Sequence, residues 1–472
     1  MPYQGELANK ASHFDFVKNP DVEKFLSECE YLREPSDEEI KAMNSGFTEP
    51  PKFSTDLLPE QVIAVDGSLH ESSINDRLPS TKVGYIKIGT MLIDMKEFGA
   101  LRADTGRFVD PFKVAKLQES NSPLTFTLPS ANIKWNGKNS VKDSFRAAVD
   151  SSLFDPKTRM VENDPKTSLR STLFLLASLR PGDMGTANPE TLRLHKCPSC
   201  GLESTQKTIE LKDIEGPQYC PEGCEIYPSD CLRVWEEISD YQSNVQAMSR
   251  FMMIVEHIIP IHYIRYLAQN SLSTLGTLAF FIDGPLAVFG NGAWIHGSIL
   301  RYLDQVNKSL NSIGKPDILM IGLQKTGQVV DHGNIIDRFV ESNRIFAIND
   351  DYRYTYILGG REAAKNGFGD ETYYGQDFIY KTASGRVFIM GLPYPCSSKR
   401  PLPEFLTKKA DVNFYPNLSR ALALINHFES DLYKNAVIPV ALAHKYTAIS
   451  LRPGGKILDL LTRRGLEGRE QG

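Results

Sequence analysis

The sequence lacks the features of a membrane-spanning, secreted or disulfide-braced protein. Seven cysteines in 472 residues are too few for a disulfide scaffold. The longest apolar stretch, residues 251–267, is interrupted by charged residues, histidines and a proline, so it does not resemble a membrane span of about 20 apolar residues. The first residues contain no apolar segment of the kind found in signal peptides. We therefore expect a cytoplasmic protein with no membrane partner.

An excess of basic charge is also missing. The chain has 53 Lys and Arg against 58 Asp and Glu, a net charge of −5. No overall positive field draws it to a polyanion, so any such partner must meet a local basic patch. The hydrophobic fraction of 41% is typical of a globular protein, and the length allows several domains or one enlarged domain.

Predicted strands and helices alternate after residue 57, and residues 1–57 form a charged segment with a helix expected at 21–33. Apolar runs predict strands at 61–65, 83–94, 277–282, 317–323 and 386–392, and helical spacing predicts helices at 168–179, 232–270, 417–427 and 441–451. Pro260 should kink the long helix. A polar loop between the first two strands favours an antiparallel pair. The fold class is therefore α/β, with a mixed sheet flanked by helices.

Five of the seven cysteines lie between Cys197 and Cys231. Four of them form two pairs separated by nineteen residues, Cys197-x2-Cys200 and Cys220-x3-Cys224. This spacing is typical of tetrahedral Zn²⁺ coordination, and a closed four-sulfur site is structural. Cys231 or His195 could replace one ligand, and a metal-free cluster of reduced cysteines is the alternative. We expect a zinc ribbon inserted into the fold.

Two aspartates follow apolar strands in similar contexts, Val65-Asp66-Gly67 and Ile282-Asp283-Gly284. Ligands bind at the carboxyl ends of strands in α/β sheets, and two carboxylates meeting there suit Mg²⁺ or Mn²⁺. The alternative is that each Asp-Gly pair is only a turn.

A site that cleaves phosphodiesters with two metal ions needs a further carboxylate. Glu256, on the border of the apolar face of the predicted long helix, is the candidate. Glu236 and Glu237, predicted on the same helix, are the alternatives.

The chain resembles the NurA nuclease family in five segments that follow the family's order over about 390 residues. They are AVDGS at 64–68, the helix with Glu256, FIDGPLA at 281–287, IGLQKTG at 321–327 and ALAHKYTAI at 441–449. The resemblance implies an RNase H-like core and a working partnership with the hexameric DNA translocase HerA. A zinc ribbon is a departure from the compact members of the family.

The resemblance also implies roles for particular residues. Asp66, Glu256 and Asp283 would hold catalytic Mn²⁺ or Mg²⁺, and His444 matches the family's C-terminal catalytic histidine. Lys325 could bind a substrate phosphate as a point charge.

Aromatic residues give weaker signals. In the NurA family a tyrosine lies shortly before the C-terminal histidine. In this chain the nearest tyrosine upstream of His444 is Tyr433, which has a different spacing, so we leave it out of the catalytic set. Tyr373, Tyr374 and Lys381 lie close together in the sequence and could contact single-stranded DNA by stacking and charge.

The resemblance divides the chain around one RNase H-like core with an insertion. The expected segments are a helical arm at 1–57, the first part of the core at 58–190, the zinc ribbon at 191–231, the second part of the core at 232–455 and a C-terminal tail at 456–472.

We therefore expect a homodimeric, metal-dependent DNA nuclease that cleaves single- or double-stranded ends by a two-metal mechanism. The resemblance implies a HerA-like hexameric ATPase as its partner, and ATP hydrolysis would come from that partner because the sequence has no Walker A motif. The role would be DNA end resection in repair or antiviral defence against phage. The alternative is a non-catalytic RNase H-like and zinc-ribbon scaffold, which is favoured if the three acids do not converge.

Overall fold

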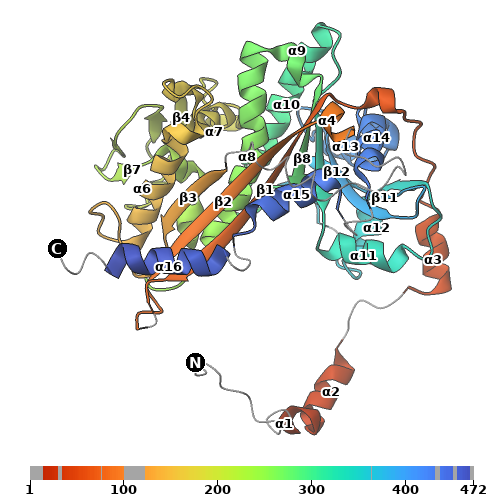
Figure 1. Ribbon diagram of the computed structural model, residues 1–472, viewed down its shortest axis with the longest axis horizontal. Coiled ribbons are helices and arrows are strands. Elements are labelled where there is room, and N and C mark those ends of the chain that lie inside the picture. The colour runs from red at the N-terminus through yellow and green to blue at the C-terminus, as the bar shows by residue number, and fades with distance from the viewer. Residues whose placement is uncertain are drawn as a thin grey trace.

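An eight-stranded mixed sheet forms the centre of the molecule (Figure 1). The computed structural model describes residues 14–29, 35–75, 77–99, 123–362, 364–430, 436–449 and 454–467. The strands of the sheet are β1 (Gln61–Ser73), β2 (Lys82–Asp94), β3 (Leu124–Pro129), β8 (Leu278–Asp283), β9 (Leu319–Gln324), β10 (Arg344–Ala347), β11 (Gly375–Lys381) and β12 (Val387–Pro393). They lie in the order β10-β11-β12-β9-β8-β1-β2-β3. The mixed α/β class expected from the sequence is confirmed.

The half of the sheet from β3 to β9 has the strand order of an RNase H-like core. β1 pairs in parallel with β8, and β8 pairs in parallel with β9. β2 runs antiparallel to both β1 and β3. β8 and β9 are buried almost throughout, as expected of parallel strands covered on both faces.

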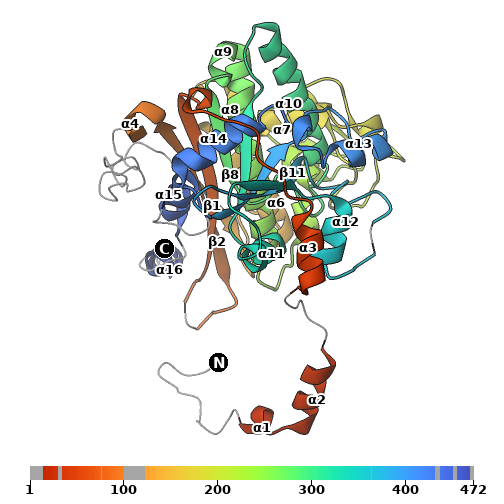
Figure 2. The ribbon, with the colours of Figure 1, turned by 90° about the vertical axis from the view of Figure 1, so that its right-hand side faces the viewer.

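Helices cover both faces of the sheet (Figure 2). One face carries α6 (Val141–Phe154), α7 (Leu169–Ser178), α8 (Val245–Asn270) and α10 (Ile295–Ser312), and the other carries α14 (Leu418–Phe428), α15 (Ile438–Thr447) and α16 (Gly454–Glu467). The remaining α-helices are α1 (Phe14–Val17), α2 (Pro20–Glu28), α3 (Asp37–Asn44), α4 (Met95–Gly99), α9 (Leu272–Leu275), α11 (Gln328–Ile336), α12 (Asp350–Tyr352) and α13 (Leu402–Lys408). The helix α16 lies in the region expected to be a C-terminal tail.

The prediction of one helix over residues 232–270 is wrong at its N-terminal end. The helix α8 begins at Val245, and the residues before it form two short 3-10 turns, Pro228–Leu232 and Val234–Glu237. Arg233 between the turns has a φ of 56°, which no helix accommodates. The side-chain amide of Asn244 then bonds the backbone of Ser239 and Ser130 and fixes the entry into α8. α8 continues through Pro260, where a kink was expected.

Four short strands form two small sheets apart from the central one. β4 (Thr191–Arg193) pairs with β5 (Glu210–Lys212), and β6 (Gln218–Tyr219) pairs with β7 (Glu225–Ile226). Buried ion pairs join this region to α6. Arg146 of α6 donates to both carboxylate oxygens of Asp230, at 2.8 and 2.7 Å.

Candidate metal centre

Asp66 and Asp283 lie side by side where β1 and β8 part. The expectation that β1 ends at Asp66 is wrong, since β1 continues to Ser73 along β2. Its parallel pairing with β8, however, stops at Val65, opposite Ile282. Asp66 and Asp283 are therefore the next residues on neighbouring parallel strands, where side chains in register point to the same face. The two strands separate at this point, within β1 and at the end of β8.

Glu256 reaches the same place from α8. Its carboxylate accepts a hydrogen bond from the backbone N–H of Gly67. A Cβ atom at residue 67 would lie 2.5 Å from Glu256 Oε1, so only glycine lets the carboxylate approach β1 this closely. Successive residues of a strand face opposite ways, so Asp66 faces α15 while Gly67 faces α8. Glu256 therefore lies beside the opening on the face opposite to Asp66, and it is not among the residues whose ligand atoms lie within 4.8 Å of one another there.

Burial and neighbouring negative charge raise the pKa values of Glu256 and Asp283. Burial, together with the charges of Asp66 and Asp283, raises the pKa of Glu256 well above its ordinary value. Burial, together with a hydrogen bond and the charge of Asp66, raises the pKa of Asp283 to about 6. Lys325 opposes both shifts, and its Nζ donates to Asp283 Oδ2 at 2.7 Å. The positive charge of Lys325 does not offset the negative charge of three neighbouring carboxylates. Carboxylate oxygens with this excess of negative charge fit a divalent cation.

α15 supplies two side chains that bond Asp66 from the other face. His444 Nδ1 lies 3.2 Å from Asp66 Oδ2, and the histidine side chain is 58% exposed. Thr447, which is fully buried, donates from Oγ1 to the same oxygen at 2.5 Å. Ligand atoms of Asp66, Asp283 and His444 all lie within 4.8 Å of one another. Sequence reasoning missed Thr447, although its place one helical turn after His444 puts both on one face of α15.

The other acids considered on the sequence lie elsewhere. Glu236 accepts hydrogen bonds from Arg233, and Glu237 pairs with Arg250. Because both precede α8, neither occupies the helix that carries Glu256.

The expectation that Tyr373, Tyr374 and Lys381 stack on or contact single-stranded DNA is wrong. Tyr374 is fully buried, and its hydroxyl lies 2.8 Å from His257 Nδ1. Tyr373 is buried as well, and Lys381 donates its Nζ to backbone carbonyls of the core. Lys381 ends β11 and the two tyrosines directly precede it; this strand is buried and was not predicted from the sequence. Tyr433 lies outside the described residues.

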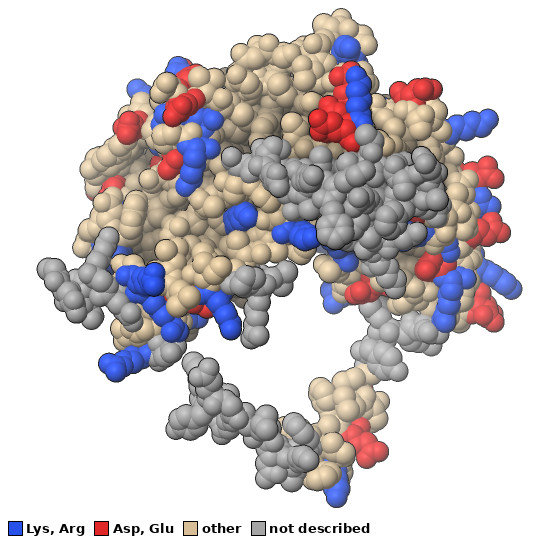
Figure 3. Space-filling model, viewed as in Figure 1, with Lys and Arg blue, Asp and Glu red and all other residues tan. Residues whose placement is uncertain are grey.

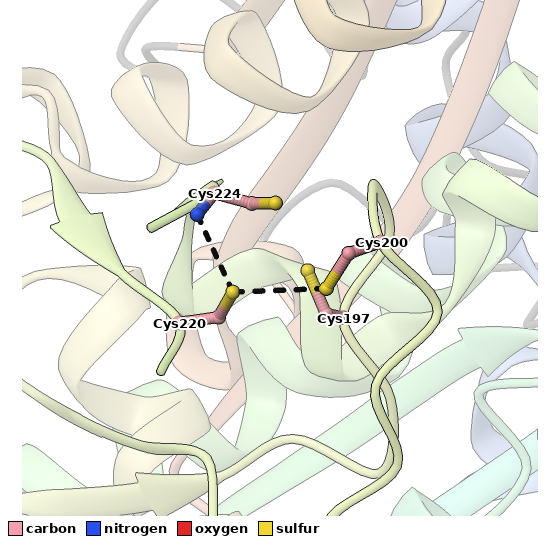
Figure 4. A group of neighbouring side chains, drawn as sticks. All are labelled: Cys197, Cys200, Cys220 and Cys224. Carbon is pink, nitrogen blue, oxygen red and sulfur yellow. Dashed lines mark hydrogen bonds between the residues drawn. The ribbon is translucent and has the colours of Figure 1, made fainter. Parts of the chain in front are cut away.

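A second candidate metal centre lies in the region of β4 to β7 (Figure 4). Four cysteines face one another there, Cys197, Cys200, Cys220 and Cys224. Their sulfur atoms lie within 4.8 Å of one another, and none of the four forms a disulfide. This group could form a zinc ribbon. Cys231 and His195, the alternative ligands, lie outside it: Cys231 is buried elsewhere and His195 is exposed.

The sheet and the acids define an α/β protein with an RNase H-like core and a polar site where parallel strands part. The family to which it belongs follows from comparison of sequences: a family model described as the NurA domain matches residues 60–449, and the chain belongs to the NurA family. NurA proteins are nucleases that act on DNA with HerA, so this chain belongs to a nuclease family. No match was found among curated proteins or among solved structures. Of the helices in the described ranges, none is both long and apolar enough to cross a bilayer.

Proposed function

We propose that this protein is a metal-dependent deoxyribonuclease whose catalytic centre is formed by Asp66, Glu256, Asp283 and His444. The observation that carries the proposal is the convergence of Asp66 and Asp283 with His444 at the opening between β1 and β8, beside Glu256 of α8, whose pKa the charges of both aspartates raise. A scaffold has no need to concentrate buried negative charge in this way, because such charge costs stability unless a cation binds. The convergence therefore favours the nuclease over the non-catalytic scaffold.

The three acids would hold one or two Mn²⁺ or Mg²⁺ ions. When bound, such ions lower the pKa of a coordinated water and offset the charge that develops on the phosphate and leaving oxygens. The chain's own groups then position the substrate. His444 is exposed on the site, and its Nδ1 faces Asp66, so its Nε2 is open to a phosphate oxygen, a water or the leaving group. Lys325 donates a hydrogen bond to Asp283. Its ammonium group would also bind a phosphate of the substrate.

We propose Zn²⁺ for the four-cysteine group, with a structural role. Four sulfur ligands leave no open position for a substrate, which is the arrangement of structural zinc sites. The ribbon braces the surface of α6 through the pair of Arg146 with Asp230.

The protein would act as a homodimer with a HerA-like hexameric ATPase that feeds it single- or double-stranded DNA ends. Family membership supports this partner. Such an assembly would work in the cytoplasm. Its role would be DNA end resection in repair or defence against phage DNA.

The test is cleavage of end-labelled single- and double-stranded DNA in Mn²⁺, with and without the ATPase. We expect Asp66→Asn, Glu256→Gln and Asp283→Asn each to lower the rate at least 100-fold, because each removes a charged ligand. Glu236→Gln is the matched control, since it removes an acid that lies outside the site, and should retain the wild-type rate. Wild-type rates in the three site variants would refute the proposed centre.

A further inference from the structure

Trp135 is an exposed tryptophan on a loop that hydrogen bonds hold in place. It lies between β3 and α6, and its exposed fraction is 42%. The backbone N–H of Trp135 donates to Ser144 Oγ of α6 at 2.9 Å. Asn132, in the same loop, donates to the backbone carbonyls of Ser80 and Asp240. A loop fixed in this way presents the indole without an ordering cost on binding, and exposed tryptophans are enriched at binding surfaces.

The indole forms one wall of a groove at the β3 edge of the sheet, between β3, α6 and α16. We call it the β3–α16 groove, and its volume is about 510 Å³. Its lining includes the apolar residues Val83, Leu128 and Leu461 and the hydroxyl-bearing residues Thr127, Ser151 and Ser152. An aromatic wall beside hydroxyl groups offers a nucleobase a stacking surface and hydrogen bonds to its edges.

The charge of the groove favours a polyanion. Of the described residues that line it, Lys134 is the only charged one, and it is exposed. Lys456 and Arg464 are also exposed on α16. Figure 3 shows Lys and Arg side chains gathered around α16, with little acidic surface among them. In a chain with a net charge of −5, this is a local basic patch of the kind that a nucleic-acid partner needs.

The opposite side of the indole has no such excess of positive charge. Trp135 also borders a second hollow of about 490 Å³, beside the zinc-ribbon region. Four carboxylates line this hollow with three cationic side chains: Asp150, Asp155, Glu215 and Glu225, with Lys138, Arg159 and Arg170. Carboxylates repel a phosphate backbone. A nucleic acid therefore favours the groove side of Trp135, where no carboxylate opposes Lys134.

The groove lies within reach of the metal centre along the sheet. Asp66 lies opposite Gly89 of β2, and Tyr85 and Val83, which line the groove, lie four and six residues before Gly89. Residues at even spacing share one face of a strand, and opposite residues share it too. At about 3.4 Å per residue the separation is about 14–20 Å. This length corresponds to about four to six nucleotides at 3.4 Å each, so one strand can occupy both places.

We propose that the β3–α16 groove binds single-stranded DNA, with a base stacked on Trp135 and a phosphate at Lys134. The strand is single because bases in a duplex stack on one another and leave no face for the indole. The inference rests on the proposed nuclease function, for which it adds a contact with the substrate strand away from the metal centre.

Binding of oligo(dT) of about 20 nucleotides to the full-length chain tests the proposal, in buffer without Mn²⁺ so that no cleavage is needed. Anisotropy of a labelled oligonucleotide gives the dissociation constant. We expect Trp135→Ala to raise it about 5- to 140-fold, the factor equivalent to the about 1–3 kcal/mol of stacking on one base. Trp135→Phe keeps a ring and should stay within about threefold of wild type. Tyr219→Ala is the matched control, since it removes an aromatic side chain that is 62% exposed outside the groove, and should keep the wild-type affinity.

Two further readouts assign the contact to particular residues. The chain has three tryptophans, of which Trp235 is buried and Trp294 half-buried. Oligo(dT) should therefore quench the tryptophan emission of the wild type, and Trp135→Phe should lose this quenching while anisotropy still reports binding. Duplex DNA of the same length should not quench. Lys134→Gln should lower the slope of log affinity against log salt by about 0.7, the value for one phosphate contact on a single strand.

Equal affinities of the wild type and Trp135→Ala, at unchanged zinc content and melting temperature, would overturn the proposal and leave the groove to an apolar protein segment. Quenching that persists in Trp135→Phe, or equal quenching by duplex, would overturn it too. If Trp135→Ala does not fold, the emission of Trp135→Phe and the salt slope of Lys134→Gln decide. The nuclease proposal fails on a different result, which is wild-type cleavage by the variants of Asp66, Glu256 and Asp283.

Discussion

Replacing Thr447 with valine should weaken metal binding without unfolding the protein. The Thr447 hydroxyl is buried and donates to Asp66 Oδ2 at 2.5 Å. It holds this carboxylate in place from α15, while His444 approaches the same oxygen at 3.2 Å. Valine has nearly the same shape as threonine, so the change removes the hydrogen bond and little else.

The expected size of the effect follows from that bond. A hydrogen bond to a charged group contributes about 1.5–3 kcal/mol. Loss of a group that orients a metal ligand typically costs about 10- to 100-fold in affinity, and a tenfold change corresponds to about 1.4 kcal/mol. We therefore expect Thr447→Val to raise the Mn²⁺ concentration for half-maximal DNA cleavage about 10- to 100-fold. The maximal rate at saturating Mn²⁺ should change much less.

The assay is a Mn²⁺ titration of the cleavage rate, with calorimetric titration of Mn²⁺ into the protein as a readout independent of turnover. Thr447→Ser keeps the hydroxyl and should stay within about threefold of wild type, well below the loss expected from removing the bond. An unchanged half-maximum in Thr447→Val would refute the positioning role. A serine variant as weak as the valine variant would show that the methyl group, and not the hydroxyl, matters.

Three further predictions concern the site, the ribbon and the β1–β2 hairpin. Gly67→Ala should lower Mn²⁺-dependent cleavage at least tenfold, because the new Cβ would lie 2.5 Å from Glu256 Oε1 and displace that carboxylate, and it should also lower the melting temperature, because the Cβ would lie 2.9 Å from Met252 Cγ. Cys197→Ser should abolish the zinc measured by elemental analysis and lower the melting temperature, since a four-sulfur site needs every ligand. Glu71→Gln should lower the free energy of unfolding at pH 7 by about 1–3 kcal/mol, as measured by urea denaturation, because it breaks a partly buried ion pair with Lys82. Burial alone would raise the pKa of Glu71, but bonds from Lys82 and two serines lower it overall, so this stabilisation is present above pH 4.5 and is lost as the pH falls below that value.

The first two of these predictions have matched controls. Gly99→Ala adds a Cβ that meets no atom of the described residues within 4 Å and should leave cleavage unchanged. Cys29→Ser removes an exposed cysteine of the arm and should keep the zinc. A wild-type rate in Gly67→Ala, full zinc in Cys197→Ser, or a stability loss in Glu71→Gln that persists undiminished at pH 3 would each contradict the corresponding argument.

Local patterns in the sequence predicted much of the sheet. β8 and β9 are continuous apolar runs, and such runs predict buried strands without knowledge of their neighbours. Asp66 and Asp283 were visible because each follows an apolar run, in β1 and in β8. The sequence could not show that β1 continues beyond Asp66, because residues 67–73 are held as a strand by pairing with β2 and not by their own composition.

Contacts between distant segments account for the other differences. Thr447 lies 381 positions from Asp66 in the chain, and no local pattern distinguishes its hydroxyl from that of any helical threonine. β11 carries Gln376 and Asp377 in its interior, polar residues that argue against a buried strand on sequence alone. Asp377 accepts hydrogen bonds from Arg353 and Gln324, and Gln376 donates to the backbone carbonyl of Ile348. The start of α8 depends on Asn244, whose partner Ser130 is 114 positions away.

Diffraction from crystals grown with Mn²⁺ tests the central claim most directly. Anomalous scattering recorded on both sides of the manganese edge would locate the ion, and the account predicts a peak bounded by carboxylate oxygens of Asp66, Asp283 and Glu256 that disappears in Asp283→Asn. The account would be contradicted if the carboxylates are ordered in the crystals but no manganese peak lies between them, at a Mn²⁺ concentration that supports DNA cleavage in solution.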